Sequence, residues 1–353
     1  MQPPAARLTR SMAESALEMA EIVGEESLAG QRMQAGAILD LIDVVAGRVA
    51  ATHGRSPCVT LSFDRVDLTQ PVLHGDLIRV EGRLGYVGRS SMMVEVEVFR
   101  QDMMTRRFNP VQRCYVTMVA IEVPSRKPNR DIPGLHVTTP EEDAVHQRAL
   151  RQKALGDAWQ RMQQEALGWG ILRAAEVEEP LNRDKQEFLS PRDTVTQVRR
   201  MFMPRHTNIL GTVFGGDLLL WMDRVGTHTA RQFTRNPHMV TLAMNRILFK
   251  EPIYPADLVE MTAQVVYVRT YTLEVEIQVT VQRMTGERVV SHSGYFIVLN
   301  YDEAGFKRPI ITGLRLADSD QDGLRRYQQA RNRFYFWREH ERLGSAGPGP
   351  ARD

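Results

Sequence analysis

Several features that mark common protein classes are scarce or absent in this chain of 353 residues. There are only two cysteines, Cys58 and Cys114, at or near strand-like segments and outside any metal or redox motif, so we expect buried structural thiols. A net charge of +2 argues against nucleic acid or a membrane surface as partner. The longest apolar runs, such as "LLLWM", are far shorter than the roughly 20 residues of a membrane span. No H-x-x-x-H spacing and no G-x-S-x-G elbow occur, so we expect neither a metal site nor a serine hydrolase.

What is present is the composition of a globular protein. Hydrophobic residues make up 42% and charged residues 25%, and the length suffices for two domains with their own cores. The N-terminal stretch "MQPPAARLTRS" has arginines but no apolar core, which excludes a secretory signal and favours a disordered tail over a remnant of organellar targeting. We therefore expect a reducing, cytoplasmic compartment, with the mitochondrial matrix as the alternative.

The sequence contains an internal repeat, in which one unit occurs twice. "CVTLSFDRVDLTQPVLHGDLIRVEGRLGYVGRSSMMVEVEVF" begins at Cys58, and "MVTLAMNRILFKEPIYPADLVEMTAQVVYVRTYTLEVEIQVT" begins at Met239. Matches at one constant offset over such a length indicate a tandem duplication. The stretch Val59-Thr60-Leu61 recurs 181 residues later as Val240-Thr241-Leu242. The same offset relates five further identical pairs, which are Arg65 and Arg246, Pro71 and Pro252, Asp76 and Asp257, Tyr86 and Tyr267, and Glu95 and Glu276.

Each unit combines one apolar helix with several long strands. The helices are "AGAILDLIDVVAGRVA" and "GGDLLLWMDRVGTHTA", and Val-rich strand segments follow each of them. A helix that is hydrophobic nearly all round cannot lie on a surface. The economical arrangement is an α+β fold in which an antiparallel sheet wraps around the helix.

These patterns divide the chain into four parts. Residues 12–125 and 195–310 form the two repeated domains, and 126–194 form a linker. In the linker, Thr139 as N-cap, Pro140 at the first helical position and Glu142 closing a capping box predict a polar surface helix to about residue 166. Residues 311–353 hold a charged helix over 321–343, whose aromatic residues we expect to dock on the domains, followed by a disordered tail.

Both apolar helices contain a buried acid at the same place. Asp43 lies within "AILDLIDVVA", and Asp223 ends "NILGTVFGGDLLLWMD". An ionised carboxylate in apolar surroundings is costly, so it requires either a structural partner, such as Arg48 for Asp43, or a function. Gly215 and Gly216 place bare N–H groups at a helix N-terminus, where they favour an oxygen that becomes negative.

Here the residues carry a family resemblance. "RHTNILGTVFGGDLLLWMD" followed by "VTLAMNRILFKEPIYPADLVEM" resembles the hotdog-fold acyl-CoA thioesterases, especially the eukaryotic acyl-CoA and acetyl-CoA hydrolases with two hotdog domains in one chain. The second repeat matches the motif closely, and the first is degenerate. The resemblance implies two hotdog domains in tandem that hydrolyse an acyl-CoA to a fatty acid and coenzyme A, which is part of the substrate rather than a cofactor.

In that family one hotdog supplies the Gly loop and a polar residue, and its partner supplies the helix acid as general base or nucleophile. The better site would join Gly215, Gly216 and Thr212 to Asp43. A second would join Asp223 to "GQRMQAG", which has Ala35 and Arg32 at the positions of the first glycine and the polar residue. Many relatives carry Asn or Asp where Thr212 stands. Asn208 and His206 are further candidates for that polar role.

The resemblance also implies binding residues and partners. A seam of basic side chains would hold coenzyme A, and assembly into a trimer of tandem chains, or a dimer, is expected. A protein that binds acyl-CoA without hydrolysing it is the alternative function, because the first repeat is degenerate. The candidate substrate-binding residues are His206, Phe214, Arg246, Lys250, Arg65 and Arg89.

Overall fold

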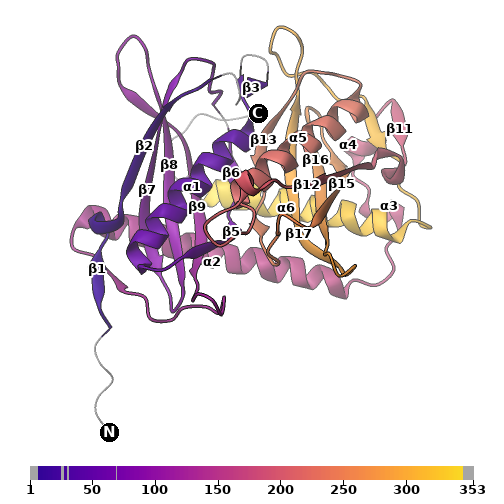
Figure 1. The fold of residues 1–353 in the computed structure, drawn as a ribbon. Coiled ribbons are helices and arrows are strands. Elements are labelled where there is room, and N and C mark those ends of the chain that lie inside the picture. The colour runs from indigo at the N-terminus through magenta and orange to yellow at the C-terminus, as the bar shows by residue number, and fades with distance from the viewer. Residues whose placement is uncertain (1–6, 25–27, 30–31, 69, 345–353) are drawn as a thin grey trace.

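The chain folds into two similar halves, each a six-stranded antiparallel sheet around one helix (Figure 1). The computed structural model describes all residues except 1–6, 25–27, 30–31, 69 and 345–353, so the predicted C-terminal tail and the start of the N-terminal tail lie outside the described residues. The central helices are α1 (Ala35–Gly54) and α5 (Gly215–Thr234). The predicted fold class, two hotdog domains in tandem, is confirmed.

The long strands fall where the Val-rich segments predicted them. The first sheet has the order β14 (Ile247–Leu248), β5 (Cys58–Phe63), β9 (Phe108–Ala120), β8 (Ser91–Gln101), β7 (Leu77–Val87) and β2 (Leu17–Ile22). The second has the order β12 (Thr196–Met201), β15 (Leu258–Val268), β16 (Thr272–Gln282), β17 (Arg288–Asn300), β13 (Met239–Met244) and β6 (Val66–Asp67). Three small pairs are β1 (Thr9–Ser11) with β10 (Gly134–His136), β11 (Glu187–Leu189) with β18 (Thr312–Leu314), and β3 (Leu28–Ala29) with β4 (Arg32–Met33).

The two sheets exchange a short strand, which the sequence did not predict. Strand β6 leaves the first repeat to pair with β13, and the equivalent strand β14 leaves the second repeat to pair with β5. The backbone N–H of Leu68 donates to Leu242 O at 2.7 Å, and that of Phe249 donates to Leu61 O at 2.8 Å. The exchange satisfies edge groups of both sheets and ties the halves together.

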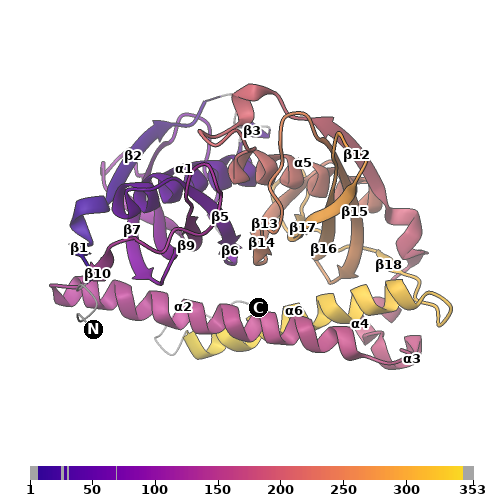
Figure 2. The ribbon, with the colours of Figure 1, turned by 60° about the horizontal axis from the view of Figure 1, so that its bottom comes forward.

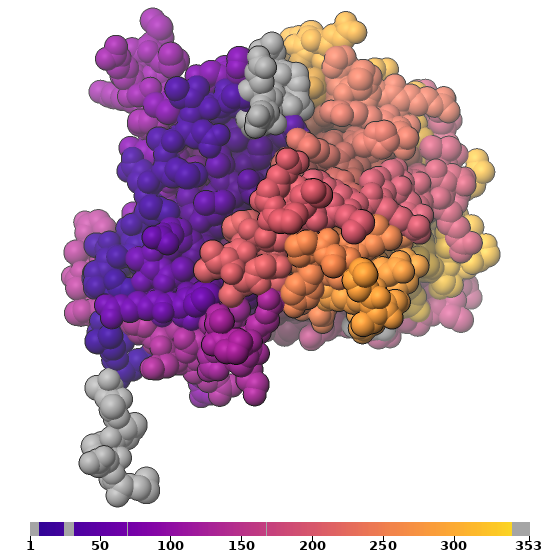
Figure 3. Space-filling model, viewed as in Figure 1, coloured from indigo at the N-terminus to yellow at the C-terminus, as the bar shows by residue number. Residues whose placement is uncertain are grey.

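Helices α1 and α5 lie against each other at the centre of the molecule, under the concave faces of the two sheets (Figure 2). Their apolar residues belong to one hydrophobic core that is continuous through both halves. Each helix ends at an arginine in the left-handed region, Arg55 with φ 48° and Arg235 with φ 50°, a helix stop that is repeated with the duplication. The surfaces of the two halves meet along one boundary (Figure 3).

Two long helices run across the outer side of the sheets (Figure 2). In α2 (Pro140–Glu165), Thr139 caps the N-terminus as predicted, but the Glu142 carboxylate accepts from Thr138 instead of closing the box on Thr139. The interpretation of α2 as a surface helix was incomplete, because Ala149 and Trp159 are buried under it. The remaining helices are α3 (Ala174–Val177), α4 (Pro180–Arg183), α6 (Gln321–Gly344) and the short 3₁₀ turns η1 (Ala13–Ser15), η3 (Ala166–Gly168), η4 (Pro191–Thr194) and η5 (Pro204–His206).

Neither cysteine is in a disulfide. Cys114 is buried as expected, whereas Cys58 is half-buried at the start of β5, so the expectation of buried thiols holds fully only for Cys114. Burial nevertheless raises the pKa of the Cys58 thiol to about 12. The thiolate, which is the reactive form, is therefore scarce at neutral pH.

The predicted docking of the C-terminal aromatics is confirmed, and it includes a buried charge. Tyr327 and Trp337 of α6 are almost completely buried. Between them Arg333, with no exposed surface, donates to Glu274 Oε1 through Nε at 2.9 Å and Nη2 at 2.6 Å, and its guanidinium lies 3.7 Å from the ring centre of Tyr295.

We expect Arg333→Ala to lower the free energy of unfolding by about 3 to 5 kcal/mol, because it leaves the Glu274 carboxylate buried without its cation. Urea unfolding followed by circular dichroism measures the change. The matched control is Arg338→Ala on the exposed side of the same helix, which should change stability by less than about 0.5 kcal/mol. Equal effects of the two variants would show that α6 is not anchored by this ion pair.

Candidate active site

The buried acid of α1 lies at the N-terminus of α5. Asp43 Oδ2 accepts the N–H of Gly216 at 2.9 Å, and Asp43 Oδ1 accepts the hydroxyl of Thr60 at 2.7 Å. The N-cap of α5, Phe214, provides no side-chain cap. The carboxylate of the other domain therefore takes the place of a capping side chain, where unpaired N–H groups and the helix dipole favour a negative charge.

The same arrangement is repeated in the opposite direction. Asp223 Oδ2 accepts the N–H of Gly36 at the N-terminus of α1 at 3.1 Å, and Asp223 Oδ1 accepts the hydroxyl of Thr241 at 2.5 Å. Both acids are almost completely buried, with 5% of Asp43 and 3% of Asp223 exposed. Within the described part of the chain neither acid forms an ion pair, and Arg48 is exposed instead of pairing with Asp43. Each acid thus faces the glycine of the other domain.

The glycines are required because the two helices approach so closely. A Cβ on Gly216 would lie 2.6 Å from the Cα of Asp40, and one on Gly36 would lie 2.5 Å from the Cα of Leu220. These distances are shorter than side chains tolerate, so only glycine permits the contact at either position. A Cβ on Gly215 would lie 3.0 Å from Asp43 Oδ2. The equivalent position in the first repeat is Ala35, so the two sites differ there.

Burial raises the pKa of both acids, against the opposing effect of the hydrogen bonds that they accept. The charged residues that act on the two acids differ in sign. Asp217 adds to the rise at Asp43, whereas Arg224 and Arg231 oppose it at Asp223. Beside Asp43 lies a further acid, Asp40, whose pKa burial and the charge of Asp217 raise to about 6.

The polar loop residues predicted for the site form hydrogen bonds within their own loop. The Asn208 side-chain oxygen accepts from the Thr212 N–H at 3.2 Å and from its hydroxyl at 3.1 Å, and Thr212 is buried. His206 is buried too, and its Nδ1 accepts the N–H of Met203 at 2.9 Å. The N–H of Phe214 donates to His206 O at 3.0 Å. These four residues shape the loop that leads into Gly215.

Two of the four predicted basic residues, Arg65 and Arg246, lie near each other, and both are engaged in contacts within the fold. Arg246 forms an ion pair with Asp64 at 2.9 Å and donates to Gly156 O of α2 at 2.6 Å. Arg65 binds Asp67 and the Asn245 side chain, and it stacks over Trp337. Both arginines therefore hold secondary structure elements together, and their role in binding coenzyme A stays a prediction. The other two candidates, Lys250 and Arg89, are exposed in loops.

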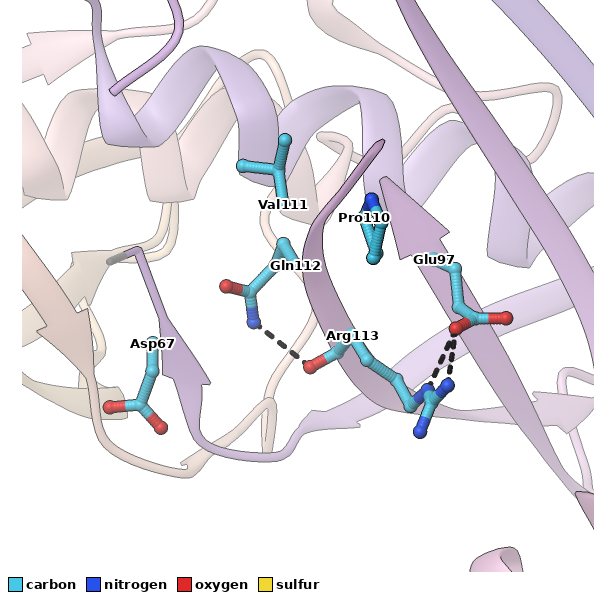
Figure 4. Close-up of a pocket in the computed structure, with 6 residues that line it drawn as sticks. All are labelled: Asp67, Glu97, Pro110, Val111, Gln112 and Arg113. Carbon is cyan, nitrogen blue, oxygen red and sulfur yellow. Dashed lines mark hydrogen bonds and ion pairs between the residues drawn. The ribbon is translucent and has the colours of Figure 1, made fainter. Parts of the chain in front are cut away.

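A small cavity of about 120 Å³ opens at the second acid. It is lined by Asp223 and Thr241 together with three arginines, Arg32, Arg224 and Arg231. A larger hollow of about 300 Å³ lies between β6 and the strands β8 and β9, lined by Asp67, Glu97, Pro110, Val111, Gln112 and Arg113 (Figure 4). That hollow is open and contains none of the residues around either acid, and Arg113 there is paired with Glu97 at 2.5 Å. Of the two, only the smaller cavity contains one of the buried acids.

Sequence reasoning missed the two threonines that bind the acids. Thr60 and Thr241 lie at the same place in the repeated stretch "VTL", so their repetition was a usable signal. Asp40 and Asp217 were missed as well, because nothing in the sequence shows that they face each other across the domains. Among the described residues there is no group of three potential metal ligands, and no helix is long and apolar enough to cross a membrane.

Comparison with known proteins places this geometry in a family. The model of the thioesterase superfamily matches residues 33–106 and 210–286, which include both acids and both glycines. Protein VdlD of Helicobacter pylori is 32% identical over 123 residues, which are 35% of this chain and 69% of VdlD. The chain belongs to the thioesterase superfamily.

Two further relatives extend the thioesterase comparison over both domains. Acyl-coenzyme A thioesterase 11 of mouse is 25% identical over 299 residues, covering 84% of this chain and 48% of that protein. An acyl-ACP thioesterase from Bacteroides thetaiotaomicron matches in structure with a TM-score of 0.50 at 12% identity, covering 82% of this chain and 100% of that chain, which shows the shared fold. The chain spans about half the length of the first curated relatives that it matches.

We expect Asp40→Asn to stabilise the protein at neutral pH but not in acid. The folded state binds the Asp40 proton up to a pKa of about 6 and the unfolded state only to about 3.8, so stability falls as the pH rises between these values. Because Asp40 is partly exposed, the gain is on the order of 1 kcal/mol above pH 7. Thermal unfolding at pH 4 and pH 7.5 measures it. A gain that is equal at both pH values would rule out the ionisation of Asp40 as its cause.

Proposed function

We propose that this protein hydrolyses acyl-CoA thioesters, with Asp43 as general base at the site that it forms with Gly215 and Gly216. The observation that carries the proposal is the buried carboxylate at an uncapped helix N-terminus, 2.9 Å from the N–H of Gly216 and contributed by the other domain. Membership of the thioesterase superfamily supports it. The arrangement is repeated in the opposite direction at Asp223, which accepts the N–H of Gly36.

Hydrolysis of a thioester needs an activated water and a place for the oxyanion. Asp43 accepts a proton from a water molecule as the water oxygen bonds to the thioester carbon. The carbon–sulfur bond then breaks, and the thiolate leaves and takes up a proton. Thr60 and Gly216 each bind one oxygen of Asp43, which fixes its orientation but leaves further lone pairs for the water. The raised pKa makes this carboxylate a stronger base.

The N-terminus of α5 provides for the developing negative charge. The N–H groups of both Gly215 and Gly216 act on Asp43, so the carbonyl oxygen of the substrate shares this end of the helix with the carboxylate. Thr212 and Asn208 keep the preceding loop in place through their mutual hydrogen bonds. Asp223 with Gly36 and Thr241 forms the second copy of the acid site.

Assembly of the chains into a trimer or dimer is part of the proposal, and mass photometry measures it.

We expect Asp43→Asn to lower the turnover of a short acyl-CoA such as butyryl-CoA by about 100- to 10,000-fold, because the amide cannot take the proton. Free-thiol release measures turnover, and Asp223→Asn is the matched control in the other site. If both variants keep the wild-type rate, neither acid is the base. A folded wild-type protein that binds butyryl-CoA without releasing thiol would establish the alternative, a binding protein.

The hydrogen bond from Thr60 lowers the pKa of Asp43, so removal of this hydrogen bond should raise that pKa. In Thr60→Val the acid stays protonated to higher pH, and the ascending limb of kcat against pH should move to higher pH with the plateau largely kept. Thr241→Val, which alters only the other acid, serves as the control for butyryl-CoA turnover. An unshifted limb in Thr60→Val would mean that Asp43 does not titrate in the rate-limiting step.

A further inference from the structure

The cavity at Asp223 is rich in positive charge. Arg32, Arg224 and Arg231 line the cavity together with Tyr301. The central helices α1 and α5 correspond residue by residue, and the same offset assigns each cavity residue an equivalent in the other repeat. The equivalents of these four residues are Thr212, Val44, Ala51 and Ile121. The second repeat thus acquired arginines, or the first lost them, within one shared scaffold.

The three arginines are held in place without being neutralised. The Arg32 guanidinium lies 5.3 Å from the ring centre of Tyr301, and Arg224 Nε donates to the Gln34 side chain at 2.9 Å. Arg231 Nη2 lies 3.5 Å from Met239 O, and its Nε is buried with no hydrogen-bond partner among the described residues. In that same part of the chain none of the three forms an ion pair within 4.0 Å. A buried donor without an acceptor is costly, which indicates an anionic ligand.

The surroundings of Asp43 contain acids where those of Asp223 contain arginines, and Arg200 and Arg205 act on one of these acids, Asp217. Asp40 and Asp217 lie beside it, and the charge of Asp217 acts on both Asp40 and Asp43. Their equivalents at the other site are Leu220 and Ala37. An anionic group is therefore attracted more strongly at Asp223 than at Asp43, although the acid, threonine and glycine of both sites are alike.

We propose that the Asp223 site takes short acyl thioesters whose acyl group ends in a carboxylate, whereas the Asp43 site takes uncharged acyl groups. The proposal rests on the thioesterase function proposed above. The arginines line the same small cavity as Asp223 and Thr241, so an anion that they bind lies next to the reacting carbonyl. In coenzyme A thioesters the whole pantetheine arm separates the sulfur from the nearest phosphate, so these phosphates cannot fill this role. The chemistry is the same hydrolysis, with Asp223 taking the proton from water.

The test compares succinyl-CoA with butyryl-CoA, which have acyl chains of equal length and differ in the terminal carboxylate. Asp43→Asn leaves only the Asp223 site and should hydrolyse succinyl-CoA at least about tenfold faster than butyryl-CoA, measured as kcat/KM. Asp223→Asn should show the reverse preference. In the Asp43→Asn background, Arg231→Met and Arg224→Gln should each lower the ratio of succinyl-CoA to butyryl-CoA turnover by roughly 10- to 100-fold, because both substrates use Asp223 but only succinyl-CoA uses the arginines.

Two controls separate this proposal from its alternatives. Arg48→Gln removes an exposed charge from α1 and should change neither preference. Val44→Arg with Ala51→Arg, in the Asp223→Asn background, places two of the cavity's charges beside Asp43 and should raise succinyl-CoA turnover relative to butyryl-CoA. Thermal unfolding confirms that each variant is folded.

The outcomes distinguish the two proposals. If Asp223→Asn hydrolyses butyryl-CoA but Asp43→Asn hydrolyses neither substrate, the thioesterase function stands and the present inference is wrong. It is also wrong if Asp43→Asn shows no preference, or if inorganic phosphate raises the melting temperature in an Arg231-dependent manner without any succinyl-CoA turnover, since the arginines then bind a free anion. Absence of all turnover in the wild-type protein contradicts both proposals.

Discussion

The reciprocal contact between the two central helices is the constraint on which the rest of the molecule depends. Each helix begins without a side-chain cap, and a buried carboxylate from the other helix accepts its free N–H group. The carboxylate is stabilised by the dipole of the helix that it caps, and the helix gains an acceptor. Each acid accepts one hydrogen bond from a threonine of its own half, but its second oxygen and the helix N-terminus are satisfied only by the other half. The two domains must therefore pair, and they must pair in one register, set by Gly36 and Gly216.

The exchanged strands and the outer helices stabilise this pairing of the two domains. Strands β6 and β14 cross to the opposite sheet, and the hydrophobic core runs through both halves without interruption. Helices α2 and α6 add buried polar contacts from outside, in which Arg148 binds Glu95 at 2.8 Å and Arg333 binds Glu274 at 2.6 Å. Such buried ion pairs contribute little net stability when complete, but they are costly to break. They hold the sheets where the close approach of α1 and α5 requires them.

Duplication within one chain allows the two acids to diverge, which identical subunits could not do. In a homodimer each substitution appears in both sites, whereas here Ala35 stands opposite Asp223 and Gly215 opposite Asp43. The charged neighbours have separated further, with Asp40 and Asp217 around one acid and arginines around the other. The reacting groups stay alike because the interlocked backbone leaves them little freedom, while side chains at the rim are free to change.

The sequence by itself determined the repeat, the fold class and the two acids, because these depend on local pattern: the constant offset, the Val-rich strands, and Asp43 and Asp223 each within an apolar helix. It also determined that the glycines precede an acid-bearing helix. Only the tertiary structure decided that β6 and β14 exchange sheets, that Thr60 and Thr241 bind the acids, and that Arg246 and Arg65 serve as structural ties. These outcomes depend on contacts between residues far apart in the chain. The charge of a residue and its spacing in the sequence do not show which distant residue its side chain contacts. An arginine looks the same in sequence whether it meets Asp64 under a helix or lines a cavity beside Asp223.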